Sequence, residues 1–286
     1  MSNMNKTIDV IMPNYNKSKF ISEAIDSVIN QSYKNWKLYI IDDNSHDNSK
    51  KILQGYKKKK KIKIFFLKKN MGPAFCRNYG LTKSKSNFIA FLDSDDYWYP
   101  EKLELTKIAT EQGSDFIYHG FKCFGDGERE RLFYPQEKKM SYTKLLFESN
   151  SIATSTVVVR KERVDAVDRF SESPQLRTAE DYDLWLRLFK KGINSLSINK
   201  ILGGYRLHGD NSGGDSQQFE AVERILHSNF KLLKTSLTQN RFRAVIRIIR
   251  NSFSNCQSIF TGRKIIKTCL ITILISTVIK MIGYTA

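Results

Sequence analysis

The chain has 286 residues, of which 41% are hydrophobic and 27% charged, a composition that can bury a core and is not typical of a disordered protein. Only 15 glycines and 5 prolines are present, which excludes collagen-like and low-complexity proteins. The 47 Lys and Arg residues exceed the 29 Asp and Glu residues, and the net charge of +18 favours anionic partners such as nucleic acid, anionic lipid or phosphorylated substrates.

The first part of the chain alternates between strand and helix patterns. Short apolar runs, each bounded by polar or turn-forming residues, predict strands over Ile8–Met12, Trp36–Ile41, Ile62–Leu67 and Phe88–Leu92. Apolar residues at helical spacing predict helices that begin at Ser18 and near Ala74. This alternation predicts an α/β fold with a doubly wound, mostly parallel sheet.

Polar clusters directly follow three of the predicted strands. They are Pro13–Asn16, Asp42–Asn44 and Asp93–Asp96. Asp and Asn are common turn formers, so one such loop alone would carry little information. Three loops at the carboxyl ends of neighbouring strands are better explained by a carboxylate-lined site, because ligands of such sheets bind beyond those ends.

Beyond Tyr97 the pattern is mixed. Further strands are predicted over 115–121 and 155–160, and a helix that begins with acidic residues is predicted over 179–188. The segment Ser212–Ser216 is the clearest linker. We therefore predict one domain over residues 1–215 and a basic, helical region over residues 216–286.

The C-terminal region has the pattern of a membrane-surface helix. Phe242, Ile246, Ile249 and Phe253 share one helical face, with arginines largely opposite, which is typical of a helix in a membrane interface. The next apolar run, Thr268–Ile279, has 12 residues, whereas a spanning helix needs about 20. We expect peripheral attachment to an anionic membrane surface, with packing on the domain or on a second copy as the alternative.

The cysteines and the N-terminus favour the cytoplasm. The four cysteines lie far apart and form no Cys-x-x-Cys or Cys/His pair typical of a zinc site or a disulfide framework. The segment Met1–Asp9 is polar and lacks the apolar core of a signal peptide. We expect a cytoplasmic protein at the inner face of the cell membrane.

The pair Asp93 and Asp95 is the most informative feature for chemistry. Two carboxylates separated by one residue, on a turn after a strand, can bind one Mg²⁺ or Mn²⁺ ion directly or through water. Such an ion would neutralise the charge that develops on a departing diphosphate. Alone, the pattern occurs by chance in many chains, and its position at the sheet edge gives it weight.

Two later motifs could complete the site. Either carboxylate of Glu180 and Asp181 could accept a proton from an attacking hydroxyl, although acids in the first turn of a helix are common. His208 follows a turn-rich, glycine-containing stretch and could contact a metal or a diphosphate, although a single His is more often structural.

The order of these motifs resembles the family-2 glycosyltransferases of bacterial surface-polysaccharide synthesis, which have the nucleotide-sugar-binding GT-A fold. The matching segments, within residues 7–212, are Val10–Asn16, Ala24–Ser32, Ile40–Ser45, Asn70–Asn78, Phe91–Trp98, Glu180–Asp181 and Tyr205–His208. The resemblance implies a Rossmann-like mixed sheet flanked by helices, followed here by the basic helical extension.

The resemblance also implies a role for each matching residue on the donor side. Pro13 and Tyr15 would border the nucleotide base, and Asp43 would accept its ring N–H. Asn70 and Arg77 would support the nucleotide or the diphosphate. Asp93 would contact the ribose or the metal, and Asp95 would bind the metal directly.

On the acceptor side, the resemblance makes Asp181 the catalytic base, with Glu180 as its neighbour. It implies transfer of one sugar from a nucleoside-diphosphate sugar, with UDP expected as the nucleotide, to a saccharide or a lipid-linked saccharide. The reaction would depend on Mn²⁺ or Mg²⁺ and invert the anomeric configuration. The Gln-x-x-Arg-Trp motif of the processive members is absent, which favours transfer of a single sugar.

Three other classes of protein fit the sequence less well than a glycosyltransferase. A sugar nucleotidyltransferase would carry a Gly-rich, basic loop after the first strand, where this chain has Met12–Asn16. A nucleic-acid-binding protein could use the ten lysines between Lys50 and Lys69, but such a run is usually a solvated face. A catalytically inactive carbohydrate-binding scaffold would not need both acidic motifs. The sequence leaves the sugar, the acceptor and the oligomeric state open.

Overall fold

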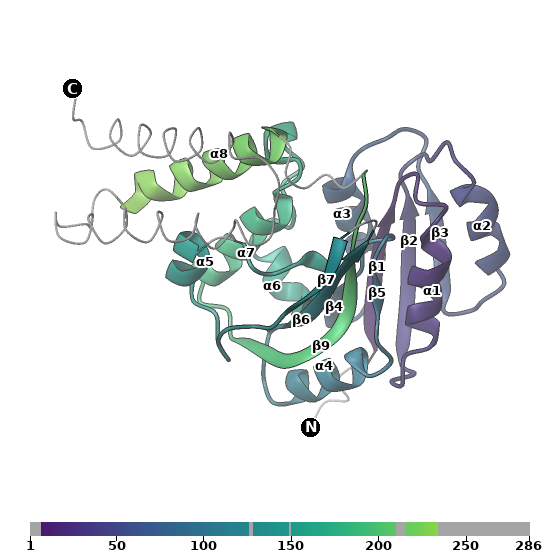
Figure 1. Ribbon diagram of the computed structural model, residues 1–286, viewed down its shortest axis with the longest axis horizontal. Helices are drawn as coiled ribbons and strands as arrows, with labels where there is room; N and C mark the ends of the chain where they lie inside the picture. Colours follow the sequence, from purple (N-terminus) through teal and green to yellow (C-terminus); the bar gives the residue numbers. More distant parts are fainter. Residues whose placement is uncertain (1–6, 126–127, 149, 210–215, 234–286) are drawn as a thin grey trace.

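The structure is a computed structural model that describes residues 7–125, 128–148, 150–209 and 216–233 (Figure 1). In these residues one nine-stranded sheet has the order β3-β2-β1-β4-β8-β6-β9-β5, with β7 paired to β6. Helices cover both faces of this sheet, so the predicted mixed α/β sheet flanked by helices is confirmed.

The N-terminal half of the sheet is parallel. Its strands are β1 (Ile8–Asn14), β2 (Trp36–Asp42), β3 (Ile62–Phe66) and β4 (Phe88–Phe91), all within two residues of the predicted bounds. β1 lies at the centre, paired with β2 on one side and β4 on the other. Every residue of β1 is buried, which explains why the apolar Val10, Ile11 and Met12 are consecutive rather than alternating with polar residues.

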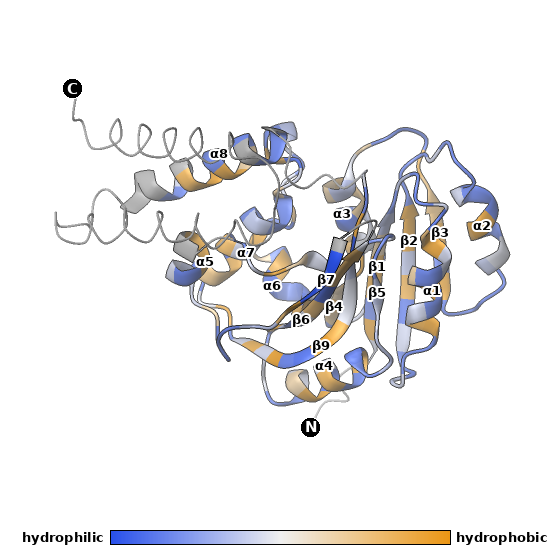
Figure 2. Cartoon of the chain, in the orientation of Figure 1, coloured by the Kyte–Doolittle hydropathy of each residue, from blue (hydrophilic) through white to orange (hydrophobic). Residues whose placement is uncertain are grey.

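The two faces of β1 belong to two different apolar cores. Val10 and Met12 pack with α1 (Ile21–Ile29), α2 (Ser49–Tyr56) and α4 (Lys102–Glu111), whereas Ile11 packs on the side of α3 (Pro73–Lys83) and α7 (Glu180–Lys190). Figure 2 shows the hydrophobic residues along the central strands and the polar residues on the outer faces of the helices. This two-layer packing fixes the strand register, and therefore where each strand ends.

The second half of the sheet adds antiparallel pairs. β8 (Val158–Arg160) is antiparallel to β4 and to β6 (Phe116–Gly125), and β9 (Ser195–Leu207) is parallel to β6. The short β5 (Tyr97–Trp98) and β7 (Glu128–Phe133) are antiparallel to β9 and β6. The remaining elements are α5 (Tyr142–Glu148), η1 (Thr154–Thr156), α6 (Lys161–Asp165), η2 (Pro174–Leu176) and α8 (Ser216–Leu233).

Two predictions of local structure were wrong. The strand expected over 155–160 begins only at Val158, because Ala153 O accepts hydrogen bonds from the backbone N–H and the hydroxyl of Thr156 and forms a 3₁₀ turn. The glycine-containing stretch before His208, read as turn-rich, is the end of the long strand β9. Its glycines serve close approach: a Cβ on Gly203 would lie 2.7 Å from Tyr97 O.

The first helix of the predicted C-terminal region packs on the domain. In α8, Ala221 and Ile225 are buried and belong to the same apolar core as α7. Tyr142 Oη, on α5, donates a hydrogen bond of 2.9 Å to Asn229 Oδ1, and the helix lies beside α5 and α7 in Figure 1. The predicted linker from 212 to 215, the amphipathic segment 242–253 and the apolar run 268–279 lie outside the described residues. None of the described helices is long and apolar enough to cross a bilayer.

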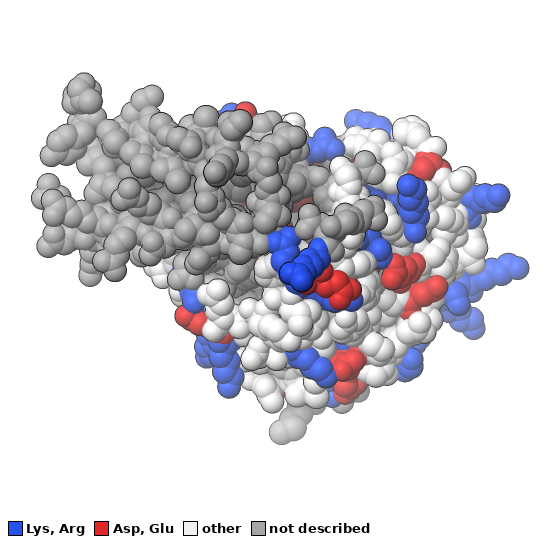
Figure 3. Space-filling view, in the orientation of Figure 1, with Lys and Arg blue, Asp and Glu red and all other residues white. Residues whose placement is uncertain are grey.

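The lysine run Lys57–Lys61 is exposed. It connects α2 to the amino-terminal end of β3. The three polar loops lie at the carboxyl ends of the strands, at the opposite edge of the sheet. Figure 3 shows Lys and Arg interspersed with Asp and Glu over this face of the molecule. The exposed lysine run is therefore consistent with a solvated face, and it lies away from the three polar loops.

Candidate active site

The three polar loops meet at one edge of the sheet, as the sequence predicts. The backbone N–H of Asp43 donates to Asn14 O over 2.8 Å, and the Asn14 amide donates to Asp42 Oδ2 over 2.8 Å. On the other side of β1, Leu92 N donates to Ile11 O over 3.1 Å. The ends of β1, β2 and β4 are thus tied together directly.

Asp43 organises the first side of the site. Both of its carboxylate oxygens accept backbone hydrogen bonds from the loop before α3, from Met71 N at 2.7 Å and from Gly72 N at 2.8 Å. Gly72 has a φ of 88°, which a residue with a side chain rarely adopts, and this turn aims the two N–H groups at the carboxylate. The Asn70 amide lies 3.4 Å from Asp43 O, so this loop is fixed next to the end of β2.

Pro13 and Tyr15 lie at the end of β1 beside this loop. Pro13 is buried, whereas Tyr15 is 40% exposed, which is unusual for a large aromatic side chain in this structure. An exposed ring next to a fixed polar loop offers a stacking surface for a flat ligand. The contact of Tyr15 with a nucleotide base stays a prediction.

Arg77 connects the two acidic motifs that lie far apart in the sequence. It is buried on α3, and its Nη1 lies 2.7 Å from Glu180 Oε1 while its Nη2 lies 2.8 Å from Asp93 Oδ1. Burial acts to lower the pKa of Arg77, but the charges of Asp93 and Glu180 raise it above its usual value. The guanidinium thus holds the loop after β4 against the start of α7, and its predicted contact with a diphosphate stays a prediction.

Asp95 forms a second charged group with Lys17 and His208. Asp95 Oδ2 lies 2.9 Å from Lys17 Nζ and 3.0 Å from His208 Nε2, and the two nitrogens are 3.2 Å apart. Burial raises the pKa of Asp95, but the hydrogen bond with His208 and the charge of Lys17 lower it below its usual value. The loop after β1, the loop after β4 and the end of β9 therefore meet at one carboxylate.

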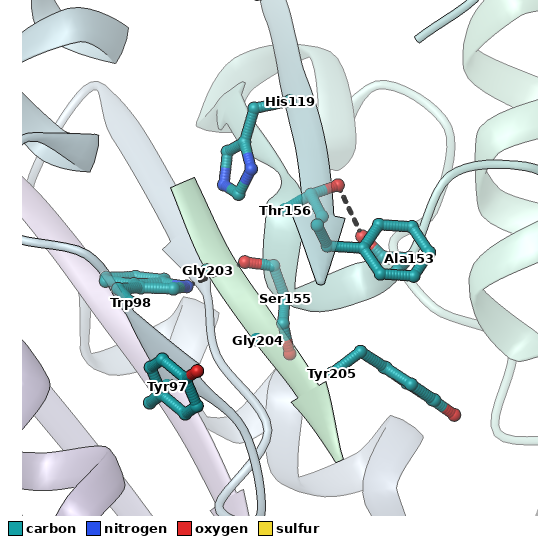
Figure 4. Close-up of a pocket in the computed structure, with 10 residues that line it drawn as sticks. Tyr97, Trp98, His119, Ala153, Ser155, Thr156, Gly203, Gly204 and Tyr205 are labelled. Atoms are coloured by element: carbon teal, nitrogen blue, oxygen red, sulfur yellow. Dashed lines mark hydrogen bonds between the residues drawn. The ribbon is translucent and has the colours of Figure 1, made fainter. Parts of the chain in front are cut away.

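The neighbouring Asp96 supports the loop from beneath. Ser155 Oγ donates to Asp96 Oδ2 over 2.6 Å and accepts from Asp93 N over 3.0 Å, and Arg206 N donates to Asp96 Oδ1 over 2.9 Å. Burial, with the charges of Asp95 and Asp93, raises the pKa of Asp96 well above its usual value. Ser155 also lines the small pocket in Figure 4, where Trp98 Nε1 donates to its carbonyl oxygen over 2.7 Å. These contacts hold the Asp93–Asp96 loop rigid.

Asp181 differs from its neighbour Glu180. Glu180 is paired with Arg77, whereas Asp181 accepts a hydrogen bond of 2.7 Å from the Thr154 hydroxyl and forms no ion pair with any described residue. Burial and the charge of Glu180 raise the pKa of Asp181 to about 6, although Thr154 and Arg77 act in the opposite direction. A carboxylate with this pKa is ionised at neutral pH and can accept a proton.

The donor atoms at Asp95 and His208 fit a divalent cation. A carboxylate oxygen and an imidazole nitrogen converge there on the ammonium of Lys17, which stands where a cation would lie. Mn²⁺ accepts both kinds of ligand. No group of three or more His, Cys, Asp or Glu side chains converges within the described ranges, and Asp93, the third predicted ligand, faces Arg77 instead. The other positions of such an ion would fall to a diphosphate and water.

Sequence reasoning did not single out several residues of this site. Lys17 follows the first polar cluster directly, and Arg206 lies within the Tyr205–His208 motif. The positions of both residues in the sequence therefore indicate that they lie near the site. Thr154 and Ser155 carried none, because a Ser/Thr-rich segment before a strand has many uses. Only the pairing of β8 with β4 brings η1 against the acidic loop.

Comparison with known proteins gives a consistent result. The sequence model of Glycosyl transferase family 2 matches residues 9–163. The putative teichuronic acid biosynthesis glycosyltransferase TuaG of Bacillus subtilis (strain 168) is 32% identical over 227 residues, which are 78% of this chain and 87% of TuaG. The UDP-Glc:alpha-D-GlcNAc-diphosphoundecaprenol beta-1,3-glucosyltransferase WfgD of Escherichia coli is 32% identical over 220 residues, 76% of this chain and 83% of WfgD.

Solved structures share the fold. Residues 1–349 of TarS from S. aureus, in complex with UDP-GlcNAc, superpose with a TM-score of 0.67 at 20% identity and cover 97% of this chain and 82% of that one. GalNAc-T7 with UDP, GalNAc and Mn²⁺ gives a TM-score of 0.59 at 13% identity, covering 77% of this chain and 47% of that one.

Proposed function

The chain belongs to glycosyltransferase family 2, and from that premise we propose that it transfers one sugar from a UDP-sugar to a hydroxyl of a lipid-linked saccharide at the inner face of the cell membrane. Of its relatives, TuaG is named for teichuronic acid biosynthesis and WfgD for glucosyl transfer to a diphosphoundecaprenol-linked GlcNAc. The observation that carries the proposal is the single connected edge at which Asp43, the Asp93–Asp96 loop and Asp181 lie, joined through Arg77 and η1.

UDP is the proposed nucleotide. WfgD is named for UDP-glucose, and TarS is known in complex with UDP-GlcNAc. In this chain the exposed ring of Tyr15 would cover one face of the uracil beside Pro13, and Asp43 with Asn70 would form its polar edge. Asp43 has both oxygens on backbone N–H groups, which fixes its direction before the donor binds.

Asp95 and His208 would hold Mn²⁺ or Mg²⁺ on the diphosphate side, with Asp93 next to the ribose. GalNAc-T7, which shares the fold, is known with UDP and Mn²⁺. When bound, the ion would neutralise charge on the departing UDP. Asp95 Oδ2 and His208 Nε2 lie 3.0 Å apart, so one ion could contact both.

Asp181 is the proposed catalytic base. The acceptor oxygen would form a bond to the anomeric carbon while the bond from that carbon to the diphosphate oxygen breaks, and the acceptor proton would pass to Asp181. Attack opposite the leaving group inverts the configuration. Because Glu180 is paired with Arg77, Asp181 is the carboxylate of the two that forms no ion pair among the described residues.

The acceptor and the membrane contact are proposed from a relative and from charge. WfgD is named for an acceptor on diphosphoundecaprenol, a membrane lipid. The net charge of +18, which includes the basic residues beyond 233, favours the anionic inner face of a membrane. The protein would then act as a peripheral enzyme.

Two measurements test the proposed function. Calorimetric titration with UDP, with and without Mn²⁺, should show binding that is tighter with the metal. Asp181→Asn should bind UDP as the unaltered protein does but lose about 10²–10⁴-fold in transfer rate, because an amide cannot accept the proton. Asp183→Asn, two residues along the same helix, is the matched control and should keep its rate.

The opposite results would be informative in different ways. Absence of UDP binding in both conditions would favour another nucleotide or an inactive scaffold. A transfer rate that survives in Asp181→Asn would place the base elsewhere.

A further inference from the structure

Lys17 occupies the centre of the charged group at Asp95. Its ammonium nitrogen lies 2.9 Å from Asp95 Oδ2 and 3.2 Å from His208 Nε2. Those are the two atoms that the proposed function assigns to a divalent cation. A cation that belongs to the chain itself therefore stands at the position of the expected metal ion.

The contact is built into the fold and is not a loose surface ion pair. Lys17 O accepts hydrogen bonds of 2.9 Å from Phe20 N and from Ile21 N, which fix its backbone at the start of α1. The Phe20 ring stacks on His208 with centroids 5.0 Å apart. The Lys17 side chain is only 17% exposed, so its charge is poorly screened by water.

The opposite wall of this group is held by Arg206. Its Nε donates to Asp95 O over 3.0 Å, and its guanidinium lies 4.8 Å from the centroid of the Phe20 ring. The same side chain pairs with Glu23 on α1. The Asp95 backbone and the His208 ring thus have contacts besides Lys17, and Lys17 has the longest and most flexible side chain of the three.

Lys17 and a metal ion cannot use these atoms together. His208 Nε2 has either one lone pair or one proton, so it accepts from Lys17 or donates to Asp95 but does not do both. A metal ion needs that lone pair and an Asp95 oxygen at about 2.0–2.2 Å, closer than any hydrogen bond. Two cations at one carboxylate oxygen would also repel each other.

We propose that Lys17 is a built-in counter-ion of the metal site: its ammonium neutralises Asp95 and contacts His208 in the free enzyme, leaves them when a divalent cation binds, and then contacts the diphosphate of the donor. The proposal rests on the function proposed above. The proposal predicts that one substitution of Lys17 has opposite effects on two affinities, because the ammonium would weaken metal binding and strengthen nucleotide binding.

The test consists of two separate titrations of the full chain. In the first, Mn²⁺ alone is added and the free ion is monitored by electron paramagnetic resonance. In the second, UDP is added in the absence of metal. Lys17→Met should bind Mn²⁺ about tenfold more tightly than the unaltered protein, the effect of removing one nearby charge. The same variant should bind UDP about tenfold more weakly. Lys17→Arg keeps the charge and should stay close to the unaltered protein in both titrations.

Lys19→Met is the matched control, since Lys19 is an exposed lysine of the same loop, and it should change neither constant. Circular dichroism would verify that each variant is folded. Equal Mn²⁺ affinity of Lys17→Met and the unaltered protein, or no Mn²⁺ binding by either, would overturn the proposal even if UDP binds. Failure of UDP to bind the unaltered protein would instead overturn the proposed function, and the Mn²⁺ comparison would still decide the role of Lys17.

Discussion

Different partners separate the chemistry of two adjacent acids, Glu180 and Asp181. Glu180 points to Arg77 and Asp181 points to Thr154, so one carboxylate is neutralised and the other is left to titrate near neutral pH. Burial and the charge of Glu180 place the pKa of Asp181 at about 6. The Thr154 hydroxyl stabilises the ionised form and therefore sets how far this pKa rises.

Thr154→Val should move the acidic limb of kcat/KM to higher pH. Without the hydroxyl, the ionised form of Asp181 loses a donor, its pKa rises further above 6, and the limb should shift by about one pH unit. The measurement is the rate of UDP release between pH 5 and 9. Thr156→Val removes a hydroxyl that donates to Ala153 O in the same 3₁₀ turn and should leave the limb in place. An equal shift in both variants would mean that the turn, and not the hydrogen bond, matters.

At the scale of the element, β9 and β5 determine where the acidic loop ends. β5 follows the Asp93–Asp96 loop directly and pairs with β9 at Gly203 and Gly204. The strands approach so closely that a Cβ on Gly203 would lie 2.7 Å from Tyr97 O, and one on Gly204 would lie 2.5 Å from the Tyr97 ring. The position of the acidic loop thus depends on the absence of a side chain at Gly203 and at Gly204.

Gly203→Ala should destabilise the protein by about 1–3 kcal/mol, because the atom it meets is backbone and cannot turn aside. It should also weaken UDP binding, since β5 would pull on the acidic loop. Urea unfolding and UDP titration measure the two effects. Gly55→Ala is the contrasting variant: a Cβ there meets nothing within 4 Å inside α2, so it should stabilise by about 0.5–1 kcal/mol. If Gly203→Ala leaves the free energy of unfolding unchanged, the two strands can separate without loss of stability.

At the scale of the whole molecule, the helix α8 belongs to the domain by packing although the sequence pattern assigns it to the C-terminal region. Ala221 and Ile225 are buried in the core that also contains Trp185. The predicted membrane segments begin only after residue 233. The boundary of the proposed membrane-attachment region therefore differs from the boundary of the packed domain.

Two truncations separate these boundaries. A chain ending at Leu233 should keep its thermal midpoint and UDP binding but lose sedimentation with vesicles that contain anionic lipid. A chain ending at residue 215 would expose the apolar face that α8 covers, and it should unfold several degrees lower, since about 1 kcal/mol corresponds to about 2–4 °C at this size. Sedimentation of the first truncation at the level of the full chain would contradict attachment through the basic tail.

The sequence determined the elements of the N-terminal half and the edge where the site lies. Buried parallel strands leave continuous apolar runs, and their polar ends must share one edge. The sequence alone therefore predicts that Pro13–Asn16, Asp42–Asn44 and Asp93–Asp96 lie together. The order of the motifs then identified the family, which the relatives confirm.

Tertiary structure alone decided which side chains meet. Arg77 lies 103 positions from Glu180 in the chain, and Lys17 lies 191 from His208. Local periodicity carries no information on such separations, because they are set by the pairing of β8 and β9 into the sheet and by packing on its two faces. For the same reason the sequence predicts Asp93, Asp95 and His208 as one set of metal ligands. In the structure Asp93 pairs with Arg77, whereas Asp95 and His208 contact Lys17.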